Sequence, residues 1–313
     1  MRAVVLAAEG AAPALADVPA PEPAAGEVLV RVSRSSVNPH DALVASGAAA
    51  RYMEYRFPVV LGSDLAGTVE AVGAGVDDLR PGERVFGLVR ERVAARGAFA
   101  ELVAVPRGWV VPVPDGVEDS AAGALGLAAL TALRCVEAVD PSAGDTVLVV
   151  GATGGVGSYA VQLVTARGAR VVATARAGEE EAHVRALGAS EVVDWSAGDV
   201  AAQVQPLHPR GIAAVIDLVD RDPDVLSRLA AAVLVPGGAA VSTGHAADPD
   251  RLPGLRARNV LAEVDQDALR EIAALAGSGR LRAPVTRTCG IEEIGSAFGL
   301  LRDGALGKIA VRV

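Results

Sequence analysis

Residues 146–157 of the chain read TVLVVGATGGVG. The first five residues are apolar or β-branched and predict a buried strand, and the glycine-rich loop after them precedes a helix predicted over residues 158–166. Such a loop lets the backbone approach a pyrophosphate, while the helix N-terminus supplies N–H donors and the positive end of a dipole. Ala152 stands where the full fingerprint has its first glycine. We predict a dinucleotide-binding turn, the alternative being an ordinary tight turn. Its predicted contacts are Ala152, Thr153, Gly154, Gly155 and Val156.

The second strand, residues 170–174, determines which dinucleotide is expected. An NAD site places Asp or Glu at the end of this strand, to bind the ribose 2′-hydroxyl. Here the residues are Thr174, Ala175 and Arg176, and an arginine suits a 2′-phosphate. We therefore predict NADPH as the cofactor, with Thr174 and Arg176 as contacts. The acidic residues 179–181 are interpreted as a solvated first helical turn, although they would repel a phosphate if they faced the site.

The chain around this unit predicts an α/β protein. Strand-like runs over residues 191–194, 213–218, 239–242 and 260–264 have helical stretches between several of them, which is typical of a parallel sheet. Upstream, residues 28–32, 67–72 and 83–86 are short β-rich runs separated by Gly and Pro. A helix is predicted over residues 120–138, and the tail from about residue 283 returns to strand-like runs.

The composition excludes several classes of partner. The 313 residues carry a net charge of −9, which argues against nucleic acid or an anionic membrane as main partners. Cys135 and Cys289 lie far apart with no Cys/His cluster, so we expect both to be packing residues. The N-terminus does not resemble a signal peptide and no apolar run could span a bilayer, so we expect a soluble, cytoplasmic protein. Lys308 is the only lysine.

Several motifs occur in order along nearly the whole chain. They are SVNPHD at residues 36–41, FPVVLGSDLAGTV at 57–69, the stretch 73–87, ALTA at 129–132, the glycine loop at 151–157, VPGG at 235–238 with the stretch that runs on to Gly244, and GK at 307–308. In this order they resemble the zinc-independent quinone oxidoreductases of the medium-chain dehydrogenase/reductase family.

The resemblance implies two domains. A GroES-like, β-rich catalytic and substrate domain is expected over residues 1–117 and 265–313, and a doubly wound Rossmann domain over residues 118–264. The nicotinamide and substrate are expected between them, and homodimers are usual, with residues 260–264 as the candidate edge strand. The zinc enzymes of the same family have a cysteine at the position of Asn38 and a histidine at that of Ser63. No catalytic metal is therefore expected.

The resemblance also implies the site residues. Asn38, Thr131, Ser242, Thr243 and Gly244 are expected beside the nicotinamide. Trp195 replaces a tyrosine that is common near the adenosine phosphate, and Glu180 replaces a lysine. Lys308 is expected to contact the cofactor, since its segment returns to the cofactor domain.

Asn38, Tyr52 and His40 are the predicted catalytic residues. Asn38 could instead be only a turn residue before a proline. His40 could donate a proton near neutral pH or simply be exposed. Tyr52 could offer a phenolic donor or only pack its loop.

The predicted function is NADPH-dependent hydride transfer to a quinone or an α,β-unsaturated carbonyl, a small-molecule substrate, without zinc. One alternative is a tailoring enzyme for a polyketide-like metabolite, or a cyclase, on the same scaffold. A second alternative is an NADPH-binding protein that has no catalytic turnover.

Overall fold

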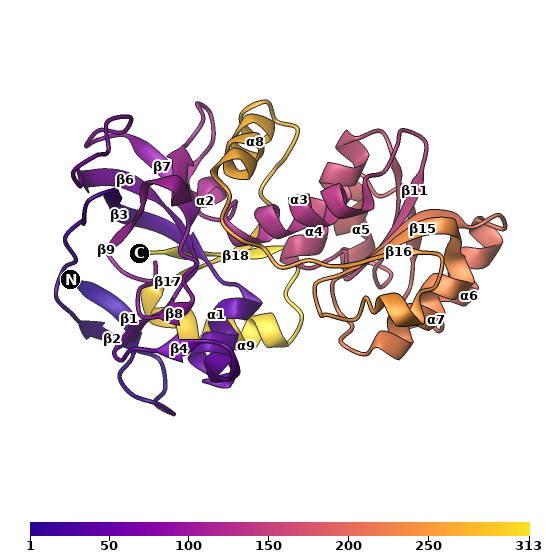
Figure 1. Cartoon of the computed structure of the whole chain (residues 1–313), viewed down its shortest axis with the longest axis horizontal. Coiled ribbons are helices and arrows are strands. Elements are labelled where there is room, and N and C mark those ends of the chain that lie inside the picture. Colours follow the sequence, from indigo (N-terminus) through magenta and orange to yellow (C-terminus); the bar gives the residue numbers. More distant parts are fainter. The chain divides into compact units, whose positions relative to one another are not determined.

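The computed structural model describes all 313 residues, which divide into two compact units (Figure 1). Unit 1 comprises Met1–Leu130 and Glu263–Val313, and unit 2 comprises Thr131–Ala262. The boundaries expected from the sequence were 117/118 and 264/265. The first boundary of the structure lies later because helix α2 (Asp119–Ala122) packs against strands β3, β6 and β18, all of which belong to unit 1.

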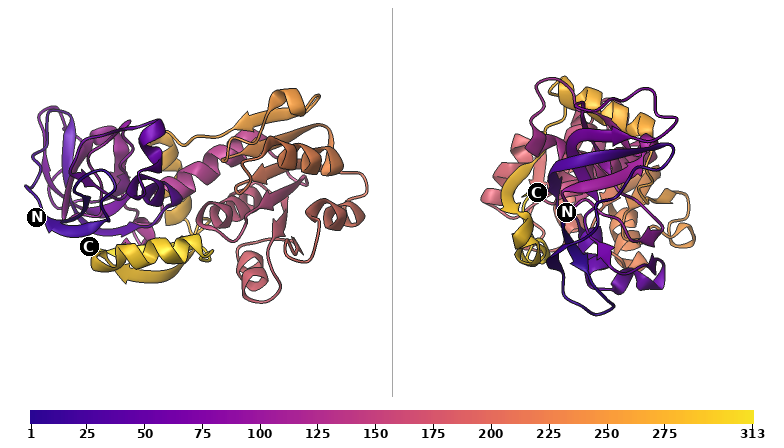
Figure 2. Two further views of the ribbon diagram at one scale, coloured as in Figure 1. Left: turned by 90° about the horizontal axis from the view of Figure 1, so that it is seen from below. Right: turned by 90° about the vertical axis from the view of Figure 1, so that its left-hand side faces the viewer.

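The larger sheet of unit 1 has seven strands in the order β10-β7-β6-β3-β18-β17, with β9 also paired to β3. Their bounds are β3 Glu27–Ser36, β6 Asp64–Val72, β7 Arg84–Leu88, β9 Leu102–Pro106, β10 Val110–Pro112, β17 Val285–Gly290 and β18 Lys308–Arg312. Paired strands run antiparallel, except for β17 and β18. The C-terminal strand β18 thus lies between β3 and β17, and Figure 2 shows the yellow C-terminal segment beside the indigo and purple N-terminal strands.

Two small sheets and several helices complete unit 1. Strand β1 (Arg2–Leu6) pairs with β2 (Ala14–Asp17) and β5 (Val59–Val60), and β4 (Glu54–Tyr55) pairs with β8 (Val93–Ala94). The remaining helices that lie wholly in this unit are α1 Pro39–Ala45, α8 Gln266–Gly277 and α9 Ile294–Arg302, with 3-10 turns at Ala48–Arg51, Arg107–Trp109 and Ile291–Glu293. Apolar residues of the strands and of the segments that connect them fill two cores, one including Val4, Leu61, Phe99 and Ile309, the other Val28, Leu65, Val85 and Val103.

Unit 2 contains one sheet of six parallel strands in the order β13-β12-β11-β14-β15-β16. The strands are β11 Thr146–Val150, β12 Arg170–Thr174, β13 Glu191–Val193, β14 Ile212–Asp217, β15 Leu234–Ser242 and β16 Arg256–Asn259. The helices that lie wholly in it are α4 Gly155–Ala166, α5 Glu179–Ala186, α6 Val200–Leu207 and α7 Pro223–Val233, with a 3-10 turn at Pro249–Arg251. Numbered within the unit, the strand order is 3-2-1-4-5-6, that of the doubly wound Rossmann fold, whose ligand crevice lies at the carboxyl ends of the two central strands.

Most predicted elements of unit 2 are confirmed. The strands predicted over residues 146–150 and 170–174 have the bounds of β11 and β12, and those over 213–218 and 239–242 fall on β14 and the second half of β15. The strand predicted over residues 260–264 is wrong, because the last strand is β16, four residues earlier. Three of the four β16 residues are exposed at this sheet edge, so the strand lacks an apolar signature.

Two predictions about helices also need correction. The helix predicted over residues 120–138 is two helices, α2 and α3 (Leu127–Val139), separated by residues 123–126. A Cβ atom on Gly126 would lie 2.4 Å from the Asp64 carboxylate, so the break follows from the close approach of a distant strand. The tail contains a helix, α9, between its two strands, where only strands were expected.

Candidate functional site

The glycine loop of unit 2 connects β11 to α4, as predicted. Gly151 has a φ of +79°, a backbone conformation that favours glycine. A Cβ atom on Gly157 would lie 2.2 Å from the carbonyl oxygen of Gly151, so glycine is required for α4 to pack this closely against the loop. The predicted contacts lie in or directly after this turn: Ala152, Thr153, Gly154, Gly155 and Val156.

The N-terminus of α4 has the features of an anion site. The helix is 12 residues long, its N-cap is Gly154, and no side chain caps its first turn. Uncapped N–H groups and the positive end of the helix dipole suit a pyrophosphate. The Thr174 hydroxyl accepts a hydrogen bond from the Gly151 N–H at 2.9 Å, which ties the loop to the end of β12. These residues fit a dinucleotide.

The predicted residues Ser242, Thr243 and Gly244 form a hydrogen-bonded turn at the carboxyl end of β15, the same end of the sheet as the glycine loop. Ser242 ends β15 beside Asp217, the last residue of β14. The Ser242 hydroxyl accepts hydrogen bonds from the N–H groups of Gly244 and Ala246 at 3.0 and 3.1 Å, and the Thr243 N–H donates to the Asp217 carbonyl at 3.1 Å. The turn is therefore well ordered by its own contacts.

Asp217 was not identified from the sequence. Its carboxylate is fully buried, and Oδ1 accepts hydrogen bonds from the N–H groups of Val219 and Asp220. Its Oδ2 atom has no hydrogen-bond partner. Burial and the neighbouring Asp217 charge raise the pKa of Asp220. The one sequence signal for Asp217 was an acidic residue that ends an apolar strand.

Arg176 lies two residues after β12, and its side chain is held by Glu180 of α5. The Arg176 Nε–H donates to Glu180 Oε1 at 2.7 Å, and the backbone N–H of Arg176 donates to Glu180 Oε2 at 2.7 Å. The guanidinium carbon lies 5.4 Å from the centre of the Trp195 ring, whose Nε1–H donates to Glu180 Oε2 at 3.3 Å. The structure thus brings together the predicted residues Arg176 and Trp195. It also turns Glu180 toward them, against the interpretation of residues 179–181 as a solvated turn.

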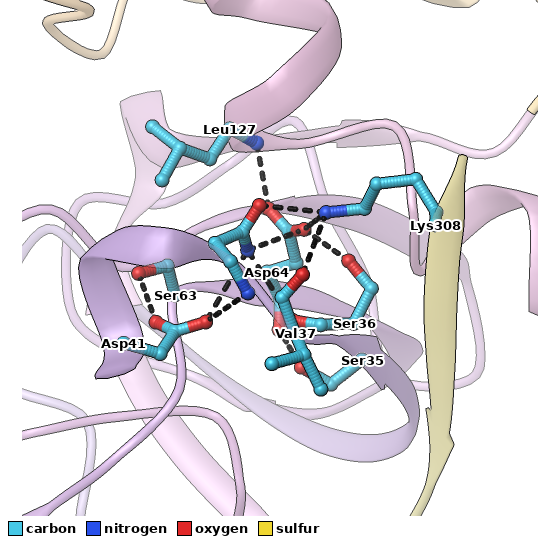
Figure 3. Close-up of polar contacts among 9 residues, drawn as sticks. Ser35, Ser36, Val37, Asp41, Ser63, Asp64, Leu127 and Lys308 are labelled. Carbon is cyan, nitrogen blue, oxygen red and sulfur yellow. Dashed lines mark hydrogen bonds and ion pairs between the residues drawn. The ribbon is translucent and has the colours of Figure 1, made fainter. Parts of the chain in front are cut away.

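Unit 1 contains a second group of polar side chains, which we call the buried polar cluster: Ser35, Ser36, Asn38, Asp41, Ser63, Asp64 and Lys308 (Figure 3). Each of its members is at most 3% exposed. The side chains come from β3, α1, β6, β18 and the connections between them. Asp64 lies at the centre of this group.

The Asp64 carboxylate accepts hydrogen bonds at both oxygens. Oδ1 accepts the Leu127 N–H at 2.6 Å, which satisfies the N-terminus of α3. Oδ2 accepts the Ser36 hydroxyl and the Asn38 amide, the latter at 2.9 Å, and lies 3.3 Å from the Lys308 ammonium (Figure 3). A buried carboxylate is therefore fully partnered and charge-compensated.

Lys308 is held by three acceptors, which match the three hydrogens of an ammonium group. They are the Val37 carbonyl at 3.2 Å, Asn38 Oδ1 at 2.6 Å and Asp64 Oδ2 at 3.3 Å. A contact between Lys308 and a cofactor would have to replace one of them, and that contact stays a prediction. The sequence singled out this lysine but missed its role as the counter-charge of Asp64.

Asn38, predicted as a catalytic and cofactor-binding residue, has its amide engaged inside the cluster. Its Nδ2 atom lies 2.9 Å from Asp64 Oδ2, 3.2 Å from the Ser36 carbonyl and 3.3 Å from Asp41 Oδ2, while Oδ1 accepts from Lys308. Two amide hydrogens therefore already have three acceptors within reach. Any contact with a substrate or cofactor would share these bonds.

Asp41 is a second buried carboxylate of the cluster. Its Oδ1 accepts the Ser63 hydroxyl at 2.6 Å and its Oδ2 accepts the Asn38 backbone N–H at 2.8 Å. Burial, together with the nearby Asp64 charge, raises the pKa of Asp41 to about 6, although the Ser63 hydrogen bond opposes this change. These contacts are those of a residue that holds the cluster together.

The two other predicted catalytic residues, Tyr52 and His40, have different surroundings. Tyr52 is 59% exposed, whereas His40 lies against Arg90, whose Nη1 is 2.9 Å from His40 Nε2. Burial and the Arg90 charge lower the pKa of His40 to about 4, so the imidazole is neutral at pH 7. The Arg90 guanidinium can only donate, so the ring nitrogen that faces it is the acceptor.

A pocket of about 40 Å³ in unit 1 is lined by His40, Asp41, Ser63, Glu91 and Arg96 together with mainly apolar residues. This volume admits a few water molecules and is too small for a quinone ring.

Thr131 lies on α3. Cys135 and Cys289 are unpaired thiols, and burial raises their pKa values to about 12 and about 11, as expected for packing residues. No three His, Cys, Asp or Glu residues come together in a way that could hold a metal ion, and none of the helices is both long and apolar enough to cross a bilayer.

Two family models match the chain. The alcohol dehydrogenase GroES-like domain matches residues 24–115, and the zinc-binding dehydrogenase model matches residues 155–277. The two matches fall mainly in unit 1 and unit 2, respectively.

Relatives and solved structures agree with these matches. The chain is 30% identical to acryloyl-coenzyme A reductase of Metallosphaera sedula, with 99% of each chain covered. It is 34% identical to a chloroplast envelope quinone oxidoreductase homolog of Arabidopsis thaliana, over 60% of this chain and only 58% of that relative. The structure of the quinone oxidoreductase from Coxiella burnetii matches with a TM-score of 0.88 and 26% identity, covering 100% of this chain and 99% of that one. With both domain models matched and full-length similarity at 30% identity, the chain belongs to the quinone oxidoreductase family of the medium-chain dehydrogenases/reductases.

Proposed function

We propose that the protein is an NADPH-dependent reductase that transfers hydride to a quinone or an α,β-unsaturated carbonyl without zinc. The observation that carries the proposal is the glycine loop with its uncapped α4 N-terminus, at the carboxyl end of the central strand β11. Relatives named quinone oxidoreductase and acryloyl-coenzyme A reductase support the substrate class.

The choice of NADPH rests on the end of β12. No carboxylate stands at Thr174 or Ala175, and Arg176 follows with a side chain that is 55% exposed. A guanidinium pairs well with the 2′-phosphate of NADPH. Trp195, also half exposed, offers an adjacent ring surface.

The residues present do not fit a catalytic zinc ion, although one matching family model is named for zinc binding. Such a site needs three N, S or O ligands from the protein. Asn38 and Ser63 stand where the zinc enzymes of the family have a cysteine and a histidine. The Asn38 amide is already bound by Lys308 and Asp64, and the Ser63 hydroxyl donates to Asp41. We therefore propose chemistry without a metal.

A bound nicotinamide supplies the hydride in this reaction. The chain would hold the pyrophosphate at the α4 N-terminus and the 2′-phosphate at Arg176. Among the predicted proton donors, the exposed phenol of Tyr52 is better suited than His40, which is neutral and faces a guanidinium.

The direct test mixes the protein with NADPH and 9,10-phenanthrenequinone or a simple enone, and follows the absorbance of the cofactor. The proposal predicts acceptor-dependent oxidation of NADPH. Tight NADPH binding without oxidation across a panel of acceptors would contradict the reductase and favour a protein without turnover. Product formed without loss of NADPH would instead indicate a cyclase.

The cofactor preference has a separate test. Arg176→Ala is expected to weaken NADPH binding far more than NADH binding, because only NADPH carries the 2′-phosphate. Equal losses for both cofactors would show that Arg176 does not contact this phosphate.

We also propose a homodimer that forms through the sheet edge of unit 2. Strand β16 pairs only with β15, and its other edge is open for another strand. Size-exclusion chromatography with light scattering tests this assembly. The expected result is twice the mass of 31.5 kDa, whereas the mass of one chain would contradict the proposal.

A further inference from the structure

The contacts between Arg176 and Glu180 bear on how the chain selects its cofactor. Besides the two 2.7 Å hydrogen bonds, the Arg176 Nη2 atom lies 2.5 Å from Glu180 Oε1. The guanidinium thus presents both its Nε and one terminal nitrogen to a single carboxylate oxygen. This ion pair forms just after the carboxyl end of β12, at the same end of the sheet as the glycine loop.

The two partners differ in exposure. The Glu180 side chain is only 10% exposed, whereas that of Arg176 is 55% exposed and has Trp195 beneath its guanidinium. Glu180 accepts hydrogen bonds from the Arg176 side chain, the Arg176 backbone and the Trp195 indole, and its pKa is lowered by these donors against the effect of burial. The carboxylate is therefore a fixed negative charge, and the open side of Arg176 is the side available to a ligand.

We propose that Glu180 is a specificity-determining residue, which competes with the 2′-phosphate of NADPH for the Arg176 guanidinium and thereby limits the preference for NADPH over NADH. A phosphate that approaches Arg176 meets a guanidinium already neutralised by a buried carboxylate, and two negative groups then share one cation. NADH carries no 2′-phosphate, so this repulsion leaves its binding unchanged. The inference rests on the proposed contact between Arg176 and the 2′-phosphate.

Glu180→Gln is the variant that isolates this effect. Glutamine keeps the size of the side chain and an oxygen that accepts the Arg176 backbone N–H, but it removes the charge. Glu181→Gln is the matched control. This substitution also removes one negative charge from α5, but Glu181 pairs with Arg185 and not with Arg176. Glu180→Asp keeps the charge, so it is expected to show no gain in binding of the 2′-phosphate.

Binding of nucleotide fragments gives a readout that does not depend on turnover. Adenosine 2′,5′-bisphosphate and 5′-AMP differ only in the 2′-phosphate, and calorimetry measures both. Glu180→Gln is expected to bind the bisphosphate about tenfold more tightly than the parent chain, with less than about a twofold change for 5′-AMP. NADPH and NADH are expected to follow the same division, and Glu181→Gln to change each affinity by less than about twofold.

The outcomes separate this inference from the proposed cofactor contact. If Glu180→Gln changes both fragments alike, or changes neither, Glu180 is a structural residue and the inference is overturned. Arg176→Ala, measured alone and in the Glu180→Gln background, tests the contact itself. If Arg176→Ala loses affinity only for the bisphosphate, and Glu180→Gln gains no affinity for it, the competition is refuted and the contact between Arg176 and the 2′-phosphate still stands. If Arg176→Ala loses no affinity for the bisphosphate, either alone or together with Glu180→Gln, both the cofactor contact and the competition are refuted.

Folding is checked in the same samples by thermal unfolding without ligand. Trp195 donates to Glu180, so its fluorescence, isolated in a Trp109→Phe background, reports whether the local arrangement survives the substitution. If Glu180→Gln unfolds, Glu180→Ala with the same pair of fragments replaces it, and the same two outcomes decide the inference.

Discussion

The ammonium nitrogen of Lys308 lies 3.3 Å from Oδ2 of Asp64, and neither side chain is more than 2% exposed. In a chain whose other basic side chains, histidines aside, are all arginine, a lysine occupies the one position where three acceptors surround a buried cation. A guanidinium is planar and larger, so it cannot fill the same space with the same bonds.

Lys308→Met is expected to lower the free energy of unfolding by about 3–5 kcal/mol, because it leaves the Asp64 carboxylate buried without a counter-charge. Lys308→Arg is expected to destabilise the fold as well, because its head group is too large. Urea unfolding measures both effects. Lys308→Met/Asp64→Asn should recover at least half of the loss, and Arg31→Met, at an exposed ion pair, should cost less than about 1 kcal/mol. A loss no larger for Lys308→Met than for this control would contradict the prediction.

Asp41 is expected to make stability depend on pH. Its folded-state pKa of about 6 lies above the value of about 4 for an unfolded aspartate, so the folded state binds the proton more tightly. The resulting stabilisation is present below about pH 4 and is lost as the pH rises through about 6. A shift of about two pKa units corresponds to about 3 kcal/mol.

The comparison with Asp41→Asn isolates this dependence. The unfolding free energy of the parent chain, minus that of the variant, is expected to fall between about pH 4 and pH 7 and to stay level above this range. Urea unfolding at a series of pH values provides the measurement. A difference that stays constant or rises with pH would be inconsistent with a raised pKa.

Two glycines of the cofactor loop are expected to respond differently to alanine. A Cβ atom on Gly157 would lie 2.2 Å from the Gly151 carbonyl oxygen, whereas on Gly154 its nearest neighbour, the same oxygen, would be 3.7 Å away. Gly157→Ala should therefore destabilise unit 2 by about 1–3 kcal/mol or more through overpacking. Gly154→Ala should keep the parent melting temperature within about 2 °C and weaken only dinucleotide binding. Thermal unfolding and calorimetry distinguish these results, and equal melting temperatures for the two variants would contradict them.

His40 is expected to stay neutral through the physiological range. Because burial and the Arg90 guanidinium lower its pKa to about 4, its ring signals in NMR should not titrate between about pH 5 and 8. If the protein reduces enones as proposed, His40→Gln should retain activity within about threefold. A loss of more than about a hundredfold would instead identify His40 as the catalytic acid.

The sequence predicted the parts of the structure that depend on local pattern. Strands β11 and β12 are short, largely apolar runs, and the glycine loop lies directly between β11 and α4. Strand β16 was misplaced because an exposed edge strand can be polar throughout. Helix α9 was missed because its segment was read together with the strands on either side of it.

The site was harder to predict because its contacts join residues far apart in the chain. Asp64 and Lys308 are separated by 244 positions, and nothing near either residue indicates the other. Glu180 is only four residues from Arg176, yet the acidic run around it reads equally well as a solvated helical turn. Only the structure shows that the Glu180 side chain turns toward Arg176 and Trp195 and away from solvent.

Strand β18, inserted between β3 and β17, also constrains how the protein can be made. During synthesis, residues 131–262 leave the ribosome as a continuous segment and can fold as soon as they emerge. The other unit must wait, because strand β18, which pairs with both β3 and β17, and the cation that neutralises Asp64 are translated about 180 residues after Leu130. Until then the nascent chain holds an incomplete sheet with an uncompensated carboxylate. Cotranslational folding is therefore expected to proceed from the middle of the chain outward.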